Sequence, residues 1–151
     1  MANNVTMSPA EFLNDVRSIA VIGVSEQKMK FGASACRELK KLGYEVYPLH
    51  PSLKTFDGAP CYAALSDLPT TPDCAFVSIR PEHATNSVKQ IADRGIKKVW
   101  FQQGKNFSEA VTLADQLGLQ NVHGRCIMMY AGPVKGIHKV HRFLNRLFGR
   151  Y

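Results

Sequence analysis

The residues best suited to chemistry in this sequence are a glycine, a serine and two lysines that follow an apolar run. The run occupies residues 19–22, Gly23 and Ser25 come next, and Lys28 and Lys30 follow shortly after. An apolar, β-branched run that ends in glycine before a helix-forming segment is typical of the junctions where α/β proteins hold phosphates. The junction therefore predicts an anion site, and the alternative is a strand–helix turn that binds nothing.

This junction differs from the dinucleotide fingerprint G-x-G-x-x-G. Ser25 and Lys28 stand at the second and third glycine positions, and the next glycine is Gly32. The loop is thus longer and more basic than a typical NAD loop, which disfavours NAD. Gly23 permits a tight turn and close approach of a ligand, so we expect Gly23→Val to abolish binding while leaving the fold largely intact.

Strand-like and helix-like segments alternate along the chain. Ser8, Pro9 and Glu11 form a helix-start signal, and Gly43 and Gly95 mark helix ends. We expect further helices at residues 33–42, 81–94 and 108–117, a helical turn at 66–68, and strands at 19–22, 45–49, 74–79, 97–101 and 119–122. This order predicts an α/β fold, a Rossmann-like doubly wound parallel sheet in three αβα layers, as one domain over residues 1–151.

Composition fits a globular protein, with 45% apolar and 21% charged residues in a chain of 151. No run approaches the roughly 18 apolar residues of a membrane span, and the first residues lack a signal-peptide pattern. The cysteines are widely spaced and form no C-x-x-C motif: Cys36, Cys61, Cys74 and Cys126. This spacing favours reduced thiols and a cytoplasmic location, and it argues against a zinc site.

The formal charge of +7 comes mainly from the C-terminal tail. From residue 125 onward the chain has no Asp or Glu and six basic residues: Arg125, Lys135, Lys139, Arg142, Arg146 and Arg150. Apolar residues at helical spacing predict a basic amphipathic helix at about 136–149. Its apolar side would pack on the body or on a second copy in a homo-oligomer. The alternatives for its basic side are an acidic partner, nucleic acid or a membrane surface.

Ligands of parallel sheets bind beyond the carboxyl ends of the strands. The rim formed by the residues at those positions is polar and cationic overall, with no acid in it: Gly23, Val24, Ser25, His50, Pro51, Ser52, Leu53, Lys54, Arg80, Pro81, Gln102, Gln103 and Gly104. An NAD site places a carboxylate after the second strand, whereas this chain has His50 and Lys54 there. A phosphorylated ribose, as in CoA or NADP, suits these cations. Taken singly, each residue is also explained as a turn former or a solvated charge.

Several motifs together resemble the small stand-alone CoA-binding domain proteins, which are similar to the N-terminal CoA-binding domain of the succinyl-CoA synthetase α subunit. The likeness covers residues 17–129. It rests on residues 19–25, Gly43-Tyr44-x-Val46-x-Pro48-x-x-Pro51, Gly58-x-x-Cys61-Tyr62, residues 99–102 and residues 125–128. The chain departs from the family at His50, where an asparagine is usual, and after Met128, where a basic segment replaces a short acidic ending.

The resemblance implies coenzyme A as the ligand and a role for each loop. The first loop would hold the phosphates through Gly23, Val24 and Ser25, helped by Lys30. The nucleotide would contact His50, Pro51 and Lys54 and would be flanked by Ile79, Arg80 and Pro81. The pantetheine arm would run along Gln102, Gln103 and Gly104.

The resemblance implies binding of CoA or an acyl-CoA more than catalysis, and no nucleophile arrangement stands out in the sequence. The alternatives are an NADP-linked oxidoreductase and a nucleic-acid or acidic-partner protein that uses the tail. Cys126 follows the last expected strand beside Arg125. It is either a small buried residue of the sheet or, if it lies near the CoA thiol, a partner in a mixed disulfide.

Overall fold

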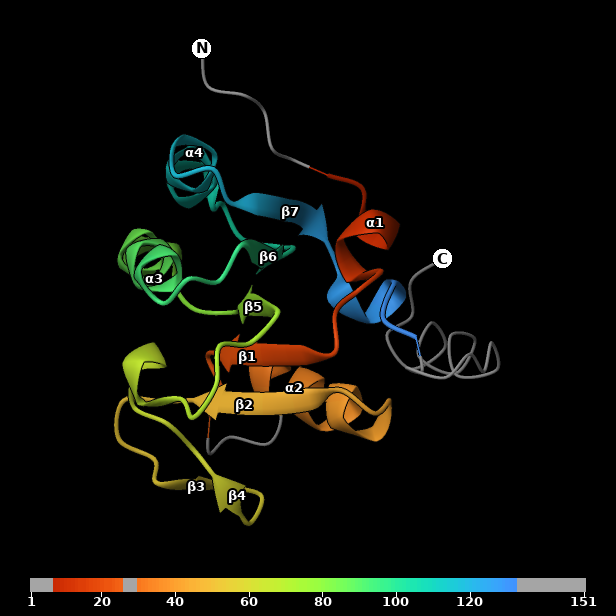
Figure 1. Ribbon diagram of the computed structural model, residues 1–151, viewed down its shortest axis with the longest axis vertical. Coiled ribbons are helices and arrows are strands. Elements are labelled where there is room, and N and C mark those ends of the chain that lie inside the picture. Colours follow the sequence, from red (N-terminus) through yellow and green to blue (C-terminus); the bar gives the residue numbers. More distant parts are fainter. Residues whose placement is uncertain (1–6, 26–29, 133–151) are drawn as a thin grey trace.

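A five-stranded parallel sheet forms the centre of the protein in the computed structural model, which describes residues 7–25 and 30–132. Its strands are β1 (Ser18–Ile22), β2 (Glu45–Leu49), β5 (Cys74–Val77), β6 (Lys98–Gln102) and β7 (Gln120–Arg125). They lie in the order β2-β1-β5-β6-β7 (Figure 1). The Rossmann-like α/β fold expected from the sequence is confirmed. The order of the strands reverses between β1 and β5, which is where such sheets bind ligands.

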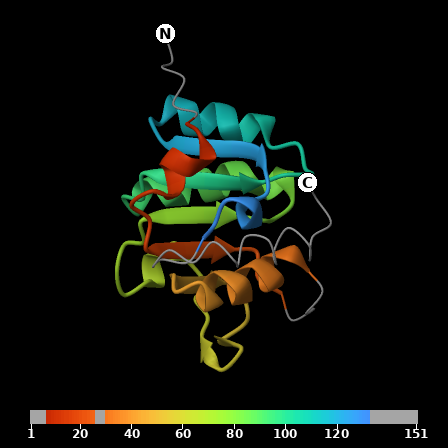
Figure 2. The same ribbon diagram turned by 90° about the vertical axis from the view of Figure 1, so that its right-hand side faces the viewer.

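Helices cover both faces of the sheet (Figures 1 and 2). One face carries α1 (Pro9–Leu13), α2 (Phe31–Lys41) and the short 3-10 helix η2 (Ile127–Met129). The other carries α3 (Pro81–Asp93) and α4 (Ser108–Gln116). No helix in the described residues is long and apolar enough to cross a bilayer. The helix expected at 136–149 and Lys28 lie outside the described residues.

Side chains of each central strand alternate between two apolar clusters. In β1, Ile19 and Val21 pack under α2, whereas Ala20 packs with residues of α3. In β6, Trp100 belongs to the first cluster and Phe101 to the second. A strand that buries both sets of side chains must be apolar throughout, which explains the continuous runs in the sequence.

Most local sequence signals are confirmed, with shifted boundaries. Ser8 and Glu11 form the expected capping box at the start of α1. Helix α2 starts at Phe31 rather than at residue 33. The helical turn expected at 66–68 is the 3-10 helix η1 (Leu65–Asp67), and the strand expected at 74–79 ends at Val77.

Strand β7 runs to Arg125, three residues beyond the expected end at 122. Its last residues are exposed, so they lack the apolar pattern that marked the other strands. The pairing of β6 with β7 is irregular: Trp100 lies opposite Val122, but Gln102 lies opposite Arg125. One extra β7 residue is therefore accommodated as a bulge, a feature that often re-aims side chains beside a functional site.

A small hairpin, β3 (Thr55–Phe56) and β4 (Ala59–Pro60), projects below β2 and was not expected from the sequence (Figure 1). The Arg37 side chain of α2 forms an ion pair with Asp57 at the hairpin tip and lies over the Phe56 ring, 5.1 Å from its centre. The hairpin is therefore fastened to α2, and it returns the chain alongside the end of β2.

The backbone at Gly23, in the first loop, which follows β1, lies very close to the backbone at the start of α2 and just after β5. Gly23 has a φ of 118°, and a Cβ built there would overlap the carbonyl oxygen of Ser78 and lie 2.8 Å from its carbonyl carbon. A Cβ at Gly32 would overlap the carbonyl oxygen of Gly23. The expectation that Gly23→Val would leave the fold intact is therefore wrong, because valine would collide with protein backbone.

We expect Gly32→Ala to lower the free energy of unfolding by about 1–3 kcal/mol, because the added methyl must push the Gly23 carbonyl away. The sign is informative, since glycine to alanine in a helix ordinarily stabilises by about 1 kcal/mol. Urea denaturation measures the difference, with Lys40→Ala on the exposed side of α2 as control, expected within about 0.5 kcal/mol of the parent. A Gly32→Ala protein of equal or greater stability would contradict the close crossing.

Candidate functional site

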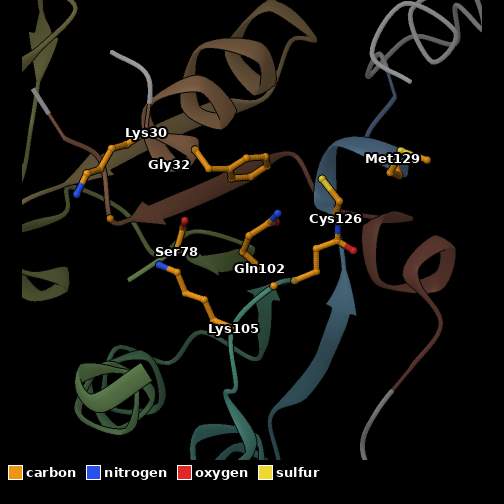
Figure 3. Close-up of a pocket in the computed structure, with 11 residues that line it drawn as sticks. Lys30, Gly32, Ser78, Gln102, Lys105, Cys126 and Met129 are labelled. Carbon is orange, nitrogen blue, oxygen red and sulfur yellow. The ribbon is translucent and has the colours of Figure 1, made fainter. Parts of the chain in front are cut away.

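A cleft of about 550 Å³ opens beside the start of α2, and we name it the α2 cleft (Figure 3). Segments that follow β1, β5 and β6 meet there with η2. Its lining residues are Gly23, Lys30, Phe31, Gly32, Ser78, Gln102, Gln103, Gly104, Lys105, Cys126 and Met129.

A second cleft, of about 380 Å³, lies along α3, and we name it the α3 cleft. Its walls combine apolar residues of the strand ends with polar residues of α3: Ile22, Gly23, Val24, Leu49, His50, Pro51, Ala63, Ala64, Leu65, Ile79, His83, Asn86, Ser87 and Gln90. Gly23 lines both clefts. The two clefts therefore adjoin at the first loop, where the strand order reverses.

The end of the α2 cleft near the first loop is basic. Lys30 is the N-cap of α2 in an extended conformation, and its side chain makes no capping hydrogen bond. Lys105 reaches across from the segment after β6, and its Nζ donates a hydrogen bond to the Ile79 carbonyl at 3.3 Å. Among the described residues that line either cleft there is no Asp or Glu. Two ammonium groups and a helix N-terminus make this end suited to an anion.

Gln102 lies between this basic end and Cys126 in the α2 cleft (Figure 3). Its side chain is buried, with 8% of the residue exposed, and among the described residues its Oε1 has no hydrogen-bond partner. A buried acceptor without a partner costs about 1–3 kcal/mol. Such an atom in a cleft is available to accept a hydrogen bond from a water or from a ligand that brings an N–H or O–H donor.

Cys126 lies at the other end of the α2 cleft, where two hydrogen bonds to backbone carbonyls fix its position. Trp100 Nε1 donates to the Arg125 carbonyl at 3.0 Å, and the Met129 N–H donates to the Cys126 carbonyl at 3.0 Å. The residue is 4% exposed yet contributes to the cleft wall. Its burial agrees with a small residue that packs in the sheet. Its place in the cleft wall agrees with a thiol beside a bound ligand, and a mixed disulfide stays a prediction.

His50 is held in a defined orientation at the α3 cleft. Its Nδ1 accepts hydrogen bonds from the N–H groups of Ser52 and Leu53, each at 3.1 Å. The backbone N–H of His50 donates a hydrogen bond to the Tyr62 carbonyl at 3.0 Å. A neutral imidazole that accepts at Nδ1 carries its proton at Nε2, so Nε2 is the donor that this ring offers.

The two clefts bring together most of the residues expected from the sequence. Gly23, Lys30, Gln102, Gln103 and Gly104 line the α2 cleft, and Gly23, Val24, His50, Pro51 and Ile79 line the α3 cleft. Ser25, Lys54, Arg80 and Pro81 line neither of them. The exposed Arg80 has its Nη1 3.9 Å from Glu82 Oε1, and Pro81 is the first residue of α3. Ligand contacts by these four residues stay predictions.

Sequence reasoning missed several lining residues: Phe31, Gly32, Ser78, Lys105, Met129, His83, Asn86, Ser87 and Gln90. Ser78 and Lys105 stand one residue after β5 and three residues after β6. A wider window after β6 would have found Lys105, whereas Ser78 was missed because the strand expected at 74–79 extended past it. The residues of α3 carry no such signal, because only packing decides which side of the helix meets the cleft.

A comparison with known families matches residues 17–131 to the CoA binding domain. The chain belongs to this family. It is homologous to the CoA-binding domain of ADP-forming acetate–CoA ligases, a succinyl-CoA synthetase-like family, so the resemblance noted from the sequence is confirmed.

Two curated relatives are much longer than the part they share with this chain. Trans-feruloyl-CoA synthase FCS1, from an unknown prokaryotic organism, is 31% identical over 121 residues, which cover 78% of this chain and 17% of that protein. The α subunit of acetate–CoA ligase (ADP-forming) II from Pyrococcus furiosus is 24% identical, over 91% of this chain and 31% of that protein. The chain thus spans less than a third of the length of these relatives.

Solved structures of similar proteins share the fold of this CoA-binding domain. A hypothetical protein from Pyrococcus horikoshii OT3 matches with a TM-score of 0.76 and 29% identity, covering 90% of this chain and 89% of that one. The dinucleotide-forming acetyl-coenzyme A synthetase 1 of Ca. Korarchaeum cryptofilum matches with a TM-score of 0.64 and 26% identity, over 70% of this chain and 25% of that one.

We expect Gln102→Met to raise the free energy of unfolding of the ligand-free protein by about 1 kcal/mol, because a thioether of similar shape removes the unpartnered oxygen. Thermal and urea unfolding would detect the gain. Asn121→Leu is the contrasting control, since Asn121 Nδ2 donates to Asp115 Oδ1 at 2.7 Å and its loss should destabilise. A clear loss of stability in Gln102→Met would show that Oε1 is already satisfied.

Proposed function

We propose that this protein binds coenzyme A or an acyl-CoA across the Gly23 loop, with the nucleotide in the α3 cleft and the pantetheine arm in the α2 cleft. The observation that carries the proposal is that the two clefts meet at the Gly23 loop, which has the sequence features of a phosphate-binding loop. CoA has the matching form, because a pyrophosphate joins its nucleotide to its arm. Membership of the CoA-binding domain family supports the same ligand.

The charge of the site favours the phosphates of CoA. Lys30 and Lys105 stand at the α2 cleft near the loop, and none of the described residues that line either cleft is acidic. The start of α2 adds its partial positive charge in the same place. The pyrophosphate would therefore lie between the helix N-terminus and these ammonium groups.

The α3 cleft suits an adenine base. Its apolar wall, which includes Ile22, Leu49 and Ile79, fits the faces of a purine, and Asn86 and Gln90 on α3 offer amide groups to its edge. His50 offers Nε2 from the loop after β2, four residues before the exposed Lys54. These two residues would face the 3′-phosphate of the ribose, the role that the sequence assigns to them.

The α2 cleft suits the pantetheine arm. The arm carries two amide N–H groups and ends in a thiol, and Gln102 offers the acceptor that such an N–H needs. A nicotinamide dinucleotide lacks this arm, so the oxidoreductase alternative predicts tighter binding of NADP than of CoA. The proposal makes no use of the basic tail. It includes the cytoplasmic location expected from the four cysteines, which are all unpaired in the structure.

We expect CoA to bind with measurable heat and NADP to bind far more weakly in calorimetric titrations of the reduced protein. Lys30→Ala and Lys105→Ala should each weaken CoA binding by about 10-fold or more, because each removes a charge-assisted contact worth about 1.5–3 kcal/mol. Lys40→Ala, on the same helix as Lys30 but outside both clefts, is the matched control. Equal loss in all three variants, or preference for NADP, would refute the site.

A further titration tests the nucleotide end. CoA should bind about 10- to 150-fold more tightly than 3′-dephospho-CoA, because His50 and Lys54 lose their partner when the phosphate is absent. His50→Ala should bring the two affinities closer together, mainly by weakening binding of CoA. If the parent protein binds both compounds equally, these residues do not recognise a ribose phosphate.

A further inference from the structure

The α2 cleft places Cys126, a thiol that CoA binding alone does not explain, beside the side chain proposed to receive the pantetheine arm. Gln102 is buried, its Oε1 has no hydrogen-bond partner among the described residues, and Cys126 lies next to it in the cleft wall (Figure 3). The bulge between β6 and β7 brings them together, since it sets Gln102 opposite Arg125, the residue before Cys126. A straight pairing would have placed another residue at the end of the cleft.

Figure 3 shows an order along the cleft: Lys30, Ser78 and Lys105 at one side, Gln102 in the middle, and Cys126 with Met129 at the other side. In the proposed binding mode the phosphates occupy the basic side and an amide of the arm meets Gln102. The end of the arm, its thiol, then points toward Cys126. The reactive ends of ligand and protein are thus both sulfur.

We propose that Cys126 exchanges with CoA disulfide bound in the α2 cleft, so that the protein carries CoA as a reversible mixed disulfide. This inference rests on the proposed function. The Cys126 thiolate attacks one sulfur of CoA disulfide, the sulfur–sulfur bond of the reagent breaks, and a new one forms between Cys126 and one CoA. The other CoA leaves as a thiolate and takes up the proton that Cys126 lost. Cys126 is oxidised and the departing CoA is reduced.

The other three cysteines are poorly suited to this exchange. Cys36, Cys61 and Cys74 are buried and line neither cleft. Burial raises the pKa of the Cys36 thiol to about 12, and it raises the pKa values of the Cys61 and Cys74 thiols as well. Exchange needs a thiolate that a disulfide can reach, so Cys126 is the residue that the cleft selects.

The restricted access to Cys126 predicts selectivity for the reagent. Only 4% of the residue is exposed, and it belongs to the cleft wall. A disulfide that docks in the clefts reaches the sulfur at high effective concentration, whereas one without the nucleotide does not. Rates of exchange should therefore saturate with CoA disulfide and differ between reagents of equal intrinsic reactivity.

The test incubates the reduced, reductant-free protein with CoA disulfide and follows its intact mass. We expect one adduct, heavier by one CoA less two hydrogens, with release of one CoA thiol and complete reversal by dithiothreitol. Fragmentation of a digest should place the adduct on Cys126 in the unmutated protein, which avoids dependence on folding of a variant. Cys126→Ala should form no adduct, and the matched control Cys61→Ala should form it normally.

Glutathione disulfide provides the comparison for docking, and we expect it to react roughly 10-fold more slowly or worse. Equal rates with both reagents, or an adduct on another cysteine, would overturn the inference. So would the absence of an adduct in a protein that binds CoA by calorimetry, which leaves the proposed function standing. Absence of CoA binding by calorimetry would instead overturn the proposed function, and this inference with it.

Discussion

The contact on which the rest of the site depends is the close crossing of three backbone segments at Gly23. The first loop touches the Ser78 carbonyl on one side, and Gly32 packs on the Gly23 carbonyl on the other. Neither approach leaves room for a Cβ, so glycine is required at both Gly23 and Gly32, which are separated in the sequence but in contact in the fold. This crossing sets the start of α2 beside the ends of β1 and β5. The basic end of the α2 cleft exists because these segments meet so closely.

The opposite end of the cleft depends on a different constraint, the anchoring of β7 by Trp100. The fully buried indole donates to the Arg125 carbonyl and packs edge-on against Phe12, with ring centres 5.3 Å apart. Because the core residue holds the end of the edge strand, the bulge keeps a fixed register and Cys126 a fixed position. Packing in the first apolar cluster is thereby linked to the geometry of the sulfur end of the cleft.

Polar groups in the two clefts are arranged by backbone hydrogen bonds more than by one another. His50 is oriented by the N–H groups of Ser52 and Leu53, and its loop is tied to Tyr62. Lys105 holds the segments after β5 and β6 together through the Ile79 carbonyl. Gln102 is the exception, since its buried Oε1 lacks a partner within the described residues. A ligand that supplies a donor there would complete the network instead of disrupting it.

Sequence alone determined the fold class, because apolar runs such as 19–22 and the glycine stops at Gly43 and Gly95 are local signals. It also placed His50 and Gln102 at the edge of the sheet formed by the carboxyl ends of the strands, since the ends of parallel strands share one edge. The end of β7, the role of Gly23 in packing and the α3 residues of the second cleft were decided by tertiary structure. Each depends on a partner distant in the chain: Trp100 for the bulge, Ser78 for Gly23, and the strand ends for α3. The pattern of residue types within one segment does not depend on such distant contacts, so only the folded structure shows them.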